Sequence, residues 1–275
     1  MTDITPIVAA KRRAFHDLHQ SGCFVIPNPW DVGSARFLQS LGFKALATTS
    51  SGFAWSKARP DGGISRDVAL AHLHEMVAAT ELPVNADFES GFAADAAGVA
   101  ESVRLACATG VAGLSIEDST GDAARPLYDL DTAVERVGAA RAAIDKAGGD
   151  ALLVGRAECF LVGRPDLEET IARLKAYAQA GADCLYAPGI HTPEQIKAVV
   201  SAVAPKPVNL LVGSASKLTV QEIAALGVRR ISVGGALARA AWGGFMRAAR
   251  LLAEQGKFDG FADAAPGKEL NSLFR

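Results

Sequence analysis

Residues 84–92 read Val-Asn-Ala-Asp-Phe-Glu-Ser-Gly-Phe, a short apolar run that ends in two acidic residues and a glycine-containing loop. The apolar start predicts a buried β-strand, and the alanine-rich segment 94–110 that follows predicts a helix. Asp87 and Glu89 stand where this strand runs out. Mg²⁺ prefers oxygen ligands and takes one or two protein carboxylates together with water and substrate. We therefore expect metal-assisted chemistry on an anionic substrate.

The same strand-loop-helix unit recurs along the chain. Eight short apolar runs alternate with longer Ala- and Leu-rich segments that carry spaced charges. The expected strands are 24–29, 45–50, 83–89, 113–118, 152–158, 184–189, 207–213 and 229–235, and the expected helices are 33–41, 65–80, 94–110, 130–147, 166–181, 192–203, 219–226 and 236–255.

Eight βα units predict an α/β fold of the (β/α)8 TIM barrel type. The alternative is a doubly wound open sheet, which would carry a glycine-rich dinucleotide motif after its first strand. The chain instead reads Asn28-Pro29-Trp30-Asp31 there. With 275 residues, 49% of them hydrophobic, residues 1–275 are expected to form a single barrel domain.

The composition excludes several classes of partner. The net charge is −2, with acidic and basic residues spread along the chain, so we expect neither nucleic acid nor an anionic membrane surface as a partner. No apolar stretch reaches the length of a membrane span, and the N-terminus lacks the apolar core of a signal peptide. Four cysteines without a CxxC spacing are expected to be reduced. These features predict a soluble, cytoplasmic protein.

Polar side chains crowd the carboxyl ends of the expected strands, where a barrel places its active site. The residues at these ends are Asn28, Trp30, Asp31, Thr49, Ser50, Ser51, Gly52, Asp87, Glu89, Glu117, Asp118, Arg156, Glu158, Tyr186, Asn209, Ser232, Gly234 and Gly235. None of the five histidines falls at a strand end, and we assign none of them a catalytic role.

This set has the composition of a site that binds a metal and a carboxylate together. Mg²⁺ chelated by a 2-oxo acid would offset the negative charge that grows on the keto oxygen as an enolate forms. Arg156 would contact a carboxylate in a planar, two-pronged manner. Ser51, Gly52 and the amide of Phe53 would form an oxyanion cradle. Structural roles remain open for Arg156, as the ion-pair partner of Glu158, and for Trp30, as a core residue.

The chain resembles the isocitrate lyase/phosphoenolpyruvate mutase superfamily across nearly the whole barrel. The motifs that carry the resemblance occur in order at 28–31, 47–52 (Ala-Thr-Thr-Ser-Ser-Gly), 59–62 (Arg-Pro-Asp-Gly), 83–92, 116–118 (Ile-Glu-Asp), 155–158 (Gly-Arg-Ala-Glu) and 180–183 (Ala-Gly-Ala-Asp).

The resemblance implies roles for individual residues. The substrate carboxylate would be held by Ser51, Gly52 and Phe53, with Trp30 and Asn209 as further substrate contacts. Mg²⁺, or Mn²⁺ in its place, would be held largely through water by Asp61, Asp87, Glu89 and Glu117, with Asp87 nearest the ion. The residues expected to carry catalysis are Arg156, Asp61 and Glu117. The resemblance also implies a homotetramer or homodimer in which a C-terminal helical segment, 236–275, is exchanged between barrels.

One departure from the superfamily pattern narrows the expected reaction. Isocitrate and methylisocitrate lyases carry a Lys-Lys/Arg-Cys-Gly-His loop after the fourth strand, and residues 119–127 here read Ser-Thr-Gly-Asp-Ala-Ala-Arg-Pro-Leu. Decarboxylation of an oxaloacetate-like substrate does not need the missing acid. We therefore expect a Mg²⁺-dependent carbon–carbon lyase that acts on a small 2-oxo acid through a pyruvate-type enolate.

Three alternatives stay open. The first is a methylisocitrate lyase-like enzyme for a larger 2-hydroxy or 2-oxo dicarboxylate, in which Arg125 or Tyr128 replaces the lost acid. The second is a phosphonopyruvate-type enzyme, which the fold alone supports. The third is a protein that binds 2-oxo acids without turning them over.

Overall fold

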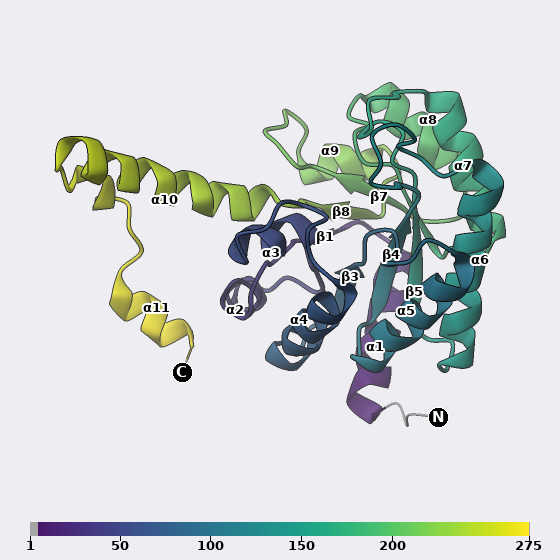
Figure 1. The fold of residues 1–275 in the computed structure, drawn as a ribbon, viewed down its shortest axis with the longest axis horizontal. Helices are drawn as coiled ribbons and strands as arrows, with labels where there is room; N and C mark the ends of the chain where they lie inside the picture. Colours follow the sequence, from purple (N-terminus) through teal and green to yellow (C-terminus); the bar gives the residue numbers. More distant parts are fainter. Residues whose placement is uncertain (1–4, 275) are drawn as a thin grey trace.

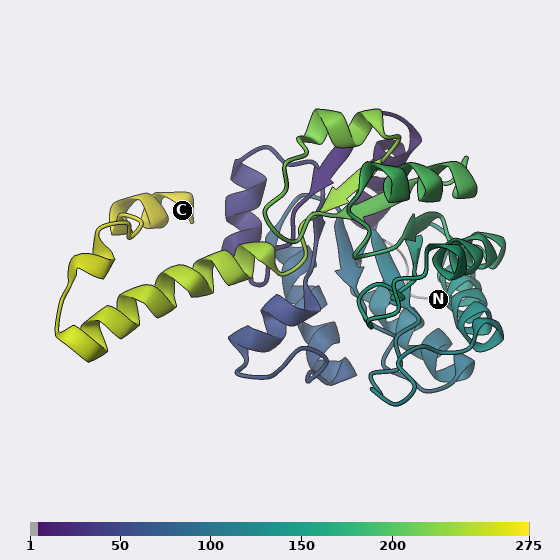
Figure 2. The same ribbon diagram turned by 90° about the horizontal axis from the view of Figure 1, so that it is seen from above.

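The structure is a computed structural model that describes residues 5–274. Eight parallel strands form one sheet in the order β1-β8-β7-β6-β5-β4-β3-β2, and helices surround it (Figures 1 and 2). The sheet curls into a nearly closed barrel, and the predicted (β/α)8 TIM barrel is confirmed.

All eight predicted strands are present, and each is shorter than predicted. Their bounds are β1 Phe24–Ile26, β2 Leu46–Ala47, β3 Val84–Asp87, β4 Gly113–Glu117, β5 Leu152–Arg156, β6 Cys184–Tyr186, β7 Val208–Leu211 and β8 Arg230–Ser232. The ladders stop where each chain segment leaves its neighbour to form the polar loops of the site. Residue 50, predicted to end a strand, instead begins a helix.

The eight predicted helices are confirmed to within two residues at each end, and further helical segments accompany them. The helical bounds are α1 Pro6–Gln20, α2 Val32–Ser40, α3 Ser50–Ser56, α4 Arg66–Ala79, α5 Ala96–Ala108, α6 Leu130–Lys146, α7 Leu167–Gln179, α8 Pro193–Val203, α9 Val220–Ala225, α10 Ala236–Gln255, the 3₁₀ turn η1 Asp259–Phe261 and α11 Gly267–Leu273. Helices α1, α3 and α11 were not predicted.

Asn28 closes the seam of the barrel. Strands β1 and β2 share no ladder, but the amide of Ala47 donates to the carbonyl of Pro27 at 3.1 Å, and the side-chain amide of Asn28 donates to the carbonyl of Thr48 at 2.9 Å. The Oδ1 atom of Asn28 accepts from the amides of Val233 and Gly234, both at 2.9 Å. One side chain thus joins the carboxyl ends of three strands.

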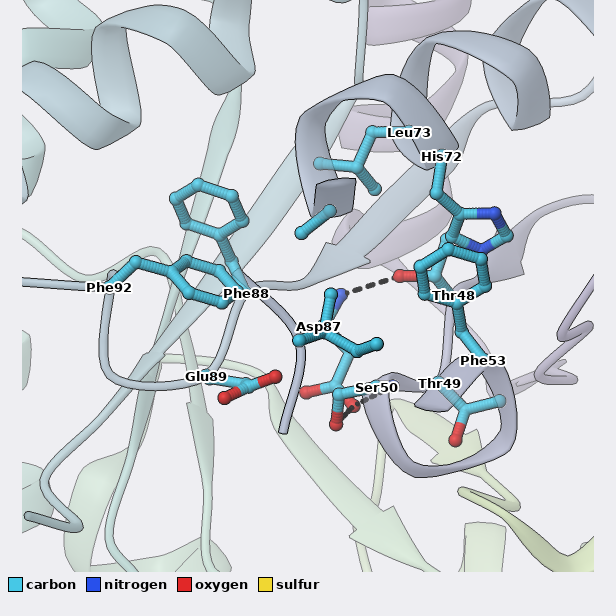
Figure 3. Close-up of a pocket in the computed structure, with 12 residues that line it drawn as sticks. Thr48, Thr49, Ser50, Phe53, His72, Leu73, Asp87, Phe88, Glu89 and Phe92 are labelled. Atoms are coloured by element: carbon cyan, nitrogen blue, oxygen red, sulfur yellow. Dashed lines mark hydrogen bonds between the residues drawn. The ribbon is translucent and has the colours of Figure 1, made fainter. Parts of the chain in front are cut away.

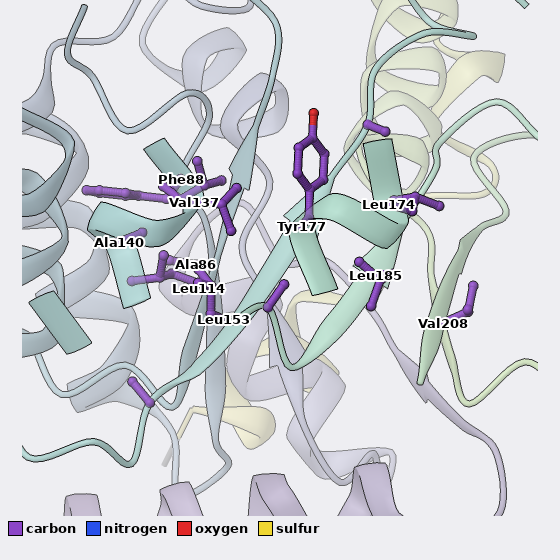
Figure 4. Close-up of a cluster of buried hydrophobic side chains, with 14 of the residues drawn as sticks. Ala86, Phe88, Leu114, Val137, Ala140, Leu153, Leu174, Tyr177, Leu185 and Val208 are labelled. Atoms are coloured by element: carbon purple, nitrogen blue, oxygen red, sulfur yellow. The ribbon is translucent and has the colours of Figure 1, made fainter. Parts of the chain in front are cut away.

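Three apolar clusters hold the barrel, and the two larger ones are an outer and an inner core. The outer core lies between strands and helices, where Leu114, Leu153 and Leu185 meet Val137 and Tyr177 (Figure 4). The inner core fills the barrel near the amino ends of the strands. There Phe15 of α1 packs among Ile26, Ala47, Leu152 and Val154 and is fully buried.

The C-terminal segment extends away from the barrel. Helix α10 projects from the end of β8, and η1 and α11 follow it back toward α2 (Figures 1 and 2). Its exposed large apolar residues include Trp242, Phe245, Met246, Leu252, Phe258, Phe261, Leu270 and Phe274. No helix within residues 5–274 combines the length and apolarity needed to cross a bilayer.

Candidate active site

Three predicted site residues end adjacent strands. Asp87, Glu117 and Arg156 are the last residues of β3, β4 and β5, and Glu117 pairs in register with Arg156. Their side chains meet at the carboxyl end of the barrel. The Nη1 atom of Arg156 lies 3.1 Å from Oδ1 of Asp87 and 3.1 Å from Oε2 of Glu117.

Arg156 also forms the ion pair with Glu158 that the sequence left open as a structural role. Its Nε donates to Oε1 of Glu158 at 2.5 Å, and the guanidinium carbon lies 5.1 Å from the ring centroid of Tyr186. One buried guanidinium is therefore held by three carboxylates. Burial raises the pKa of Glu117 well above its ordinary value, against the opposing effect of Arg156.

Asp87 is oriented by residues that follow β2. The amide and the hydroxyl of Ser50 both donate to its Oδ2, at 2.9 and 2.8 Å, and its own amide donates to the hydroxyl of Thr48 at 2.9 Å (Figure 3). These contacts fix the carboxylate without neutralising it. Ser50 was named among the strand-end residues but was given no role.

Glu89 reaches the same place from an unusual backbone conformation. Its φ is 49°, in the left-handed region that residues other than glycine rarely adopt, and its carboxylate lies beside Asp87 (Figure 3). The loop that carries it is tied down by Arg136, which donates to the carbonyls of Ser90, Ala93 and Ala94. Burial and the nearby carboxylates raise the pKa of Glu89 to about 7.

Asp61 comes to the rim from the loop after α3. It lines the same cavity as Asp87 and Arg156. Burial, with Asp87 second, raises the pKa of Asp61. Neither Asp61 nor Glu89 forms an ion pair with any residue in 5–274.

The predicted oxyanion cradle is only partly at the cavity. Ser51 lines it, but the amide of Gly52 donates to the Thr49 hydroxyl at 3.3 Å and that of Phe53 to the Thr49 carbonyl at 3.0 Å, because Thr49 caps α3. The Phe53 ring stacks on His72, 3.7 Å between centroids (Figure 3). Both amides have partners at the start of α3 in this structure, and the oxyanion cradle stays a prediction.

Two other predicted substrate contacts lie in different surroundings. Asn209 lines the cavity deep in the barrel, where its amide nitrogen donates to the Ser232 hydroxyl and its oxygen accepts from Nε of Arg230, both at 2.9 Å. Trp30 does not line this cavity, and its Cβ lies against Gly52. Arg230 was missed by the sequence analysis.

The donor set at the rim fits a hard divalent cation. Five carboxylates, those of Asp61, Asp87, Glu89, Glu117 and Glu158, lie around the guanidinium of Arg156, and burial, with the negative charges of Asp87 and Asp61 second, raises the pKa of Glu89. No three His, Cys, Asp or Glu side chains within residues 5–274 converge as direct ligands of one ion. A cation here would be held by few direct contacts and by water, the usual manner of Mg²⁺.

The loop that departs from the superfamily pattern presents no acid to the cavity. Ser119 and Leu127 pair across its base, and Arg125 is exposed at its tip. The guanidinium of Arg136 lies 4.1 Å from the ring centroid of Tyr128. In this conformation neither Arg125 nor Tyr128 lines the cavity.

Comparisons with known proteins show which family the chain resembles. Residues 15–253 match the phosphoenolpyruvate phosphomutase family. An oxaloacetate decarboxylase of Paraburkholderia xenovorans (strain LB400) is 30% identical over 202 residues, which cover 70% of this chain and 66% of that protein. The structure of a proposed lyase/mutase from Burkholderia cenocepacia J2315 superposes with a TM-score of 0.94 at 50% identity, covering 98% and 97% of the two chains. That of oxaloacetate acetylhydrolase with its product oxalate gives 0.85 at 27% identity, covering 98% and 94%.

Proposed function

The chain belongs to the phosphoenolpyruvate phosphomutase family and is a lyase, and from that premise we propose a Mg²⁺-dependent carbon–carbon lyase that acts on a small 2-oxo acid, in the manner of an oxaloacetate decarboxylase. One observation carries the proposal. Arg156 is shared among Asp87, Glu117 and Glu158, which leaves Glu89 and Asp61 beside Asp87 with no cation among residues 5–274. A divalent cation at this place would balance the charge and chelate a 2-oxo acid.

The chain's own residues would serve the reaction in distinct ways. In decarboxylation the bond to the departing carboxylate breaks, CO₂ leaves, and the electron pair moves toward the keto oxygen. The enolate that results then takes up one proton from water at the carbon that lost CO₂, which gives pyruvate. Bound Mg²⁺ would supply the electrophilic stabilisation of that oxygen. Arg156 would hold the substrate carboxylate and stabilise the enolate, while Asp61, Asp87, Glu89 and Glu117 would position the ion through water.

The proposal is tested by turnover of a panel of 2-oxo acids, with pyruvate as the detected product. We expect oxaloacetate to yield pyruvate in the presence of Mg²⁺ and not in EDTA. Asp87→Ala should abolish metal-dependent turnover without unfolding the protein, whereas Asp17→Ala, an exposed substitution on α1, should leave it unchanged. Full activity of Asp87→Ala would refute the metal assignment.

The same panel separates the alternatives. An aldehyde or a second acid beside pyruvate would indicate a methylisocitrate lyase-like enzyme. Release of phosphate from phosphonopyruvate would indicate a phosphonopyruvate-type enzyme. Binding of oxalate with Mg²⁺ but no turnover would indicate a binding protein. The exposed position of Arg125 and the packing of Tyr128 against Arg136 weigh against the first of these.

We also propose that residues 236–275 are an oligomerisation segment. Phe245 is 62% exposed and stacks edge-on with Trp242, and such exposed apolar surface favours a protein contact. Exchange of the helix in a homodimer or homotetramer, and a cytoplasmic location, remain predictions. Light scattering should show that the native protein is an oligomer and that Phe245→Ser weakens it. Ile7→Ser, at an exposed apolar position on α1, is the control and should not weaken the oligomer. A monomeric native protein would exclude the proposed role of residues 236–275.

A further inference from the structure

Arg230 is a charged residue inside the barrel. It begins β8, pairs in register with Phe24 and Asn209, and is only 2% exposed. Its Nε donates to Oδ1 of Asn209 at 2.9 Å, and its Nη1 approaches Oδ1 of Asn85 at 3.5 Å and Nε2 of His19 at 3.4 Å. These side chains lie one layer deeper in the barrel than the rim of Asp87 and Arg156.

All the partners of Arg230 in residues 5–274 are neutral. Asn209 and Asn85 carry no charge, and Nδ1 of His19 donates to the Phe15 carbonyl at 2.7 Å, which leaves Nε2 to accept. Burial, with the positive charge of Arg230, lowers the pKa of His19 to about 3, so this imidazole stays uncharged. A buried charge is normally paired, because it has lost its hydration.

Comparison with the other buried arginines shows what is distinctive here. Arg173 pairs with Asp118 and Glu169, and Arg156 pairs with three carboxylates. Arg12 and Arg136 donate to backbone carbonyls of packed segments. Arg230 instead lines a cavity, and its Nη2 has no hydrogen-bond partner in the part of the chain that the structure describes.

The cavity connects the two layers. Its volume is about 180 Å³, and it is lined at the rim by Asp61, Asp87 and Arg156 and at the floor by Asn85, Asn209 and Arg230. This volume is well above the minimum that a single water molecule needs, and it has room for a small acid. The charge of Arg156 is already met by carboxylates, so Arg230 is the guanidinium in this cavity that still lacks an anion.

We propose that Arg230, held in place by Asn209 and Asn85, forms an anion-binding subsite on the cavity floor, which takes the carboxylate of the substrate that lies farthest from the metal rim. The inference rests on the proposed function and narrows its substrate class to 2-oxo acids with two carboxylates. A guanidinium matches the planar geometry of a carboxylate and binds it in its charged form. Arg230 therefore contributes to substrate affinity and selectivity.

A matched pair of stable ligands tests the subsite. Malate and 2-hydroxybutyrate share the 2-hydroxy acid end that can chelate the metal, and they differ at the far carbon, which is a carboxylate in malate and a methyl group in 2-hydroxybutyrate. Their dissociation constants are measured by calorimetry with saturating Mg²⁺ on the native protein, Arg230→Met and Arg230→Lys. Met replaces the guanidinium with an uncharged chain of similar length, and Lys keeps the charge without the planar fork.

We expect the native protein to bind malate at least about tenfold more tightly than 2-hydroxybutyrate, as one charge-assisted contact implies. Arg230→Met should lose that preference by weakening malate alone, and Arg230→Lys should keep part of it. The melting temperature of ligand-free Arg230→Met should not fall, because an unpaired buried charge is removed. Equal affinities in the native protein, or a preference that survives in Arg230→Met, would overturn the subsite.

Oxalate separates this inference from the proposed function. It is short enough to occupy the metal rim alone, so its Mg²⁺-dependent stabilisation should be the same in the native protein and Arg230→Met. Retained oxalate binding without a preference for malate would remove the subsite and leave the proposed function standing. Failure of oxalate to bind the native protein would count against the metal rim itself.

Discussion

Ser50 donates two hydrogen bonds to one oxygen of Asp87, from its amide at 2.9 Å and from its hydroxyl at 2.8 Å. The first residue of α3 therefore holds the side chain of the last residue of β3. The orientation of the Asp87 carboxylate thus depends on where α3 begins. The remaining oxygen of Asp87 faces Arg156. A change at Ser50 should thus act on the metal site without removing any proposed ligand.

Ser50→Ala should weaken Mg²⁺ binding. The substitution removes one charge-assisted hydrogen bond, an interaction of about 1.5–3 kcal/mol, and frees the carboxylate to rotate. We expect roughly tenfold more Mg²⁺ to be needed for half-maximal stabilisation by oxalate. Ser56→Ala is the control, because its hydroxyl donates to the carbonyl of Phe53 within the same helix. Equal Mg²⁺ requirements in the two variants would show that Ser50 does not orient Asp87.

The affinity for Mg²⁺ should depend on pH through Glu89. Its pKa is raised to about 7, and a carboxylate must be ionised to hold a cation, directly or through water. The affinity should therefore fall as the pH decreases from about 8 to about 6. Glu89→Gln should bind Mg²⁺ more weakly than the native protein at the higher pH, and its Mg²⁺ affinity should no longer depend on pH. If the pH profile of Glu89→Gln is unchanged, another group causes the pH dependence.

The stability of the metal-free protein should depend on pH in the opposite direction: it should decrease as the pH rises. Because the folded-state pKa of Glu89 lies above its ordinary value, ionisation of Glu89 destabilises the fold as the pH rises from about 4.5 through about 7. Glu89→Gln should be more stable than the native protein at the upper end of that window. Urea unfolding in EDTA, at several pH values, measures the stability of the native protein and of Glu89→Gln.

Arg136 should control the position of Glu89. It donates to three carbonyls of the loop at 90–94, which contains left-handed backbone at Gly91 and Phe92. Arg136→Leu leaves those carbonyls without donors and should lower the free energy of unfolding by about 3 kcal/mol. Arg104→Ala, at an exposed ion pair, should change it by less than about 0.5 kcal/mol. A stable Arg136→Leu protein with native Mg²⁺ affinity would contradict this role.

His72 should destabilise the fold in acid. Burial, with Lys57, lowers its pKa to about 4, below the unfolded value, so the stability that the neutral ring contributes is lost as the pH falls from about 6.5 toward about 4. The expected loss by about pH 5 is about 2 kcal/mol. His72→Leu should flatten this limb of the stability profile and His74→Leu, exposed on the same helix, should not. Parallel profiles for all three proteins would rule out His72.

The sequence allowed the barrel and much of its rim to be predicted, for a physical reason. Asp87, Glu117 and Arg156 each end an apolar run, and parallel strands bring such ends together. Helix α3 could not be foreseen, because seven residues are too few to show a helical period. The hydrogen bonds of the Gly52 and Phe53 amides at the start of that helix could not be foreseen for the same reason.

Arg230 was missed because two consecutive arginines, Arg229 and Arg230, open the predicted strand at 229–235, and such a pair suggests solvent-facing residues. The alternation of polar and apolar residues along β8 did indicate a polar face, since Arg230 and Ser232 share one face of the strand and Ile231 lies on the other. Deciding which face is interior needed the neighbouring strands. The contacts of Arg230 with Asn209 and Asn85 come from residues far away in the sequence.

Phe15 of α1 is fully buried inside the barrel at the end away from the rim, and we expect ligands to enter and leave through the rim alone. Substrate binding and product release would then use the same opening. A new substrate molecule should therefore bind only after both products of the proposed reaction have left. In the proposed decarboxylation, CO₂ would have no group for the rim to hold and should leave first, whereas pyruvate would keep the oxo acid end and should leave last. Pyruvate should consequently inhibit competitively against the substrate, and the turnover rate should track its escape when the chemical step is fast.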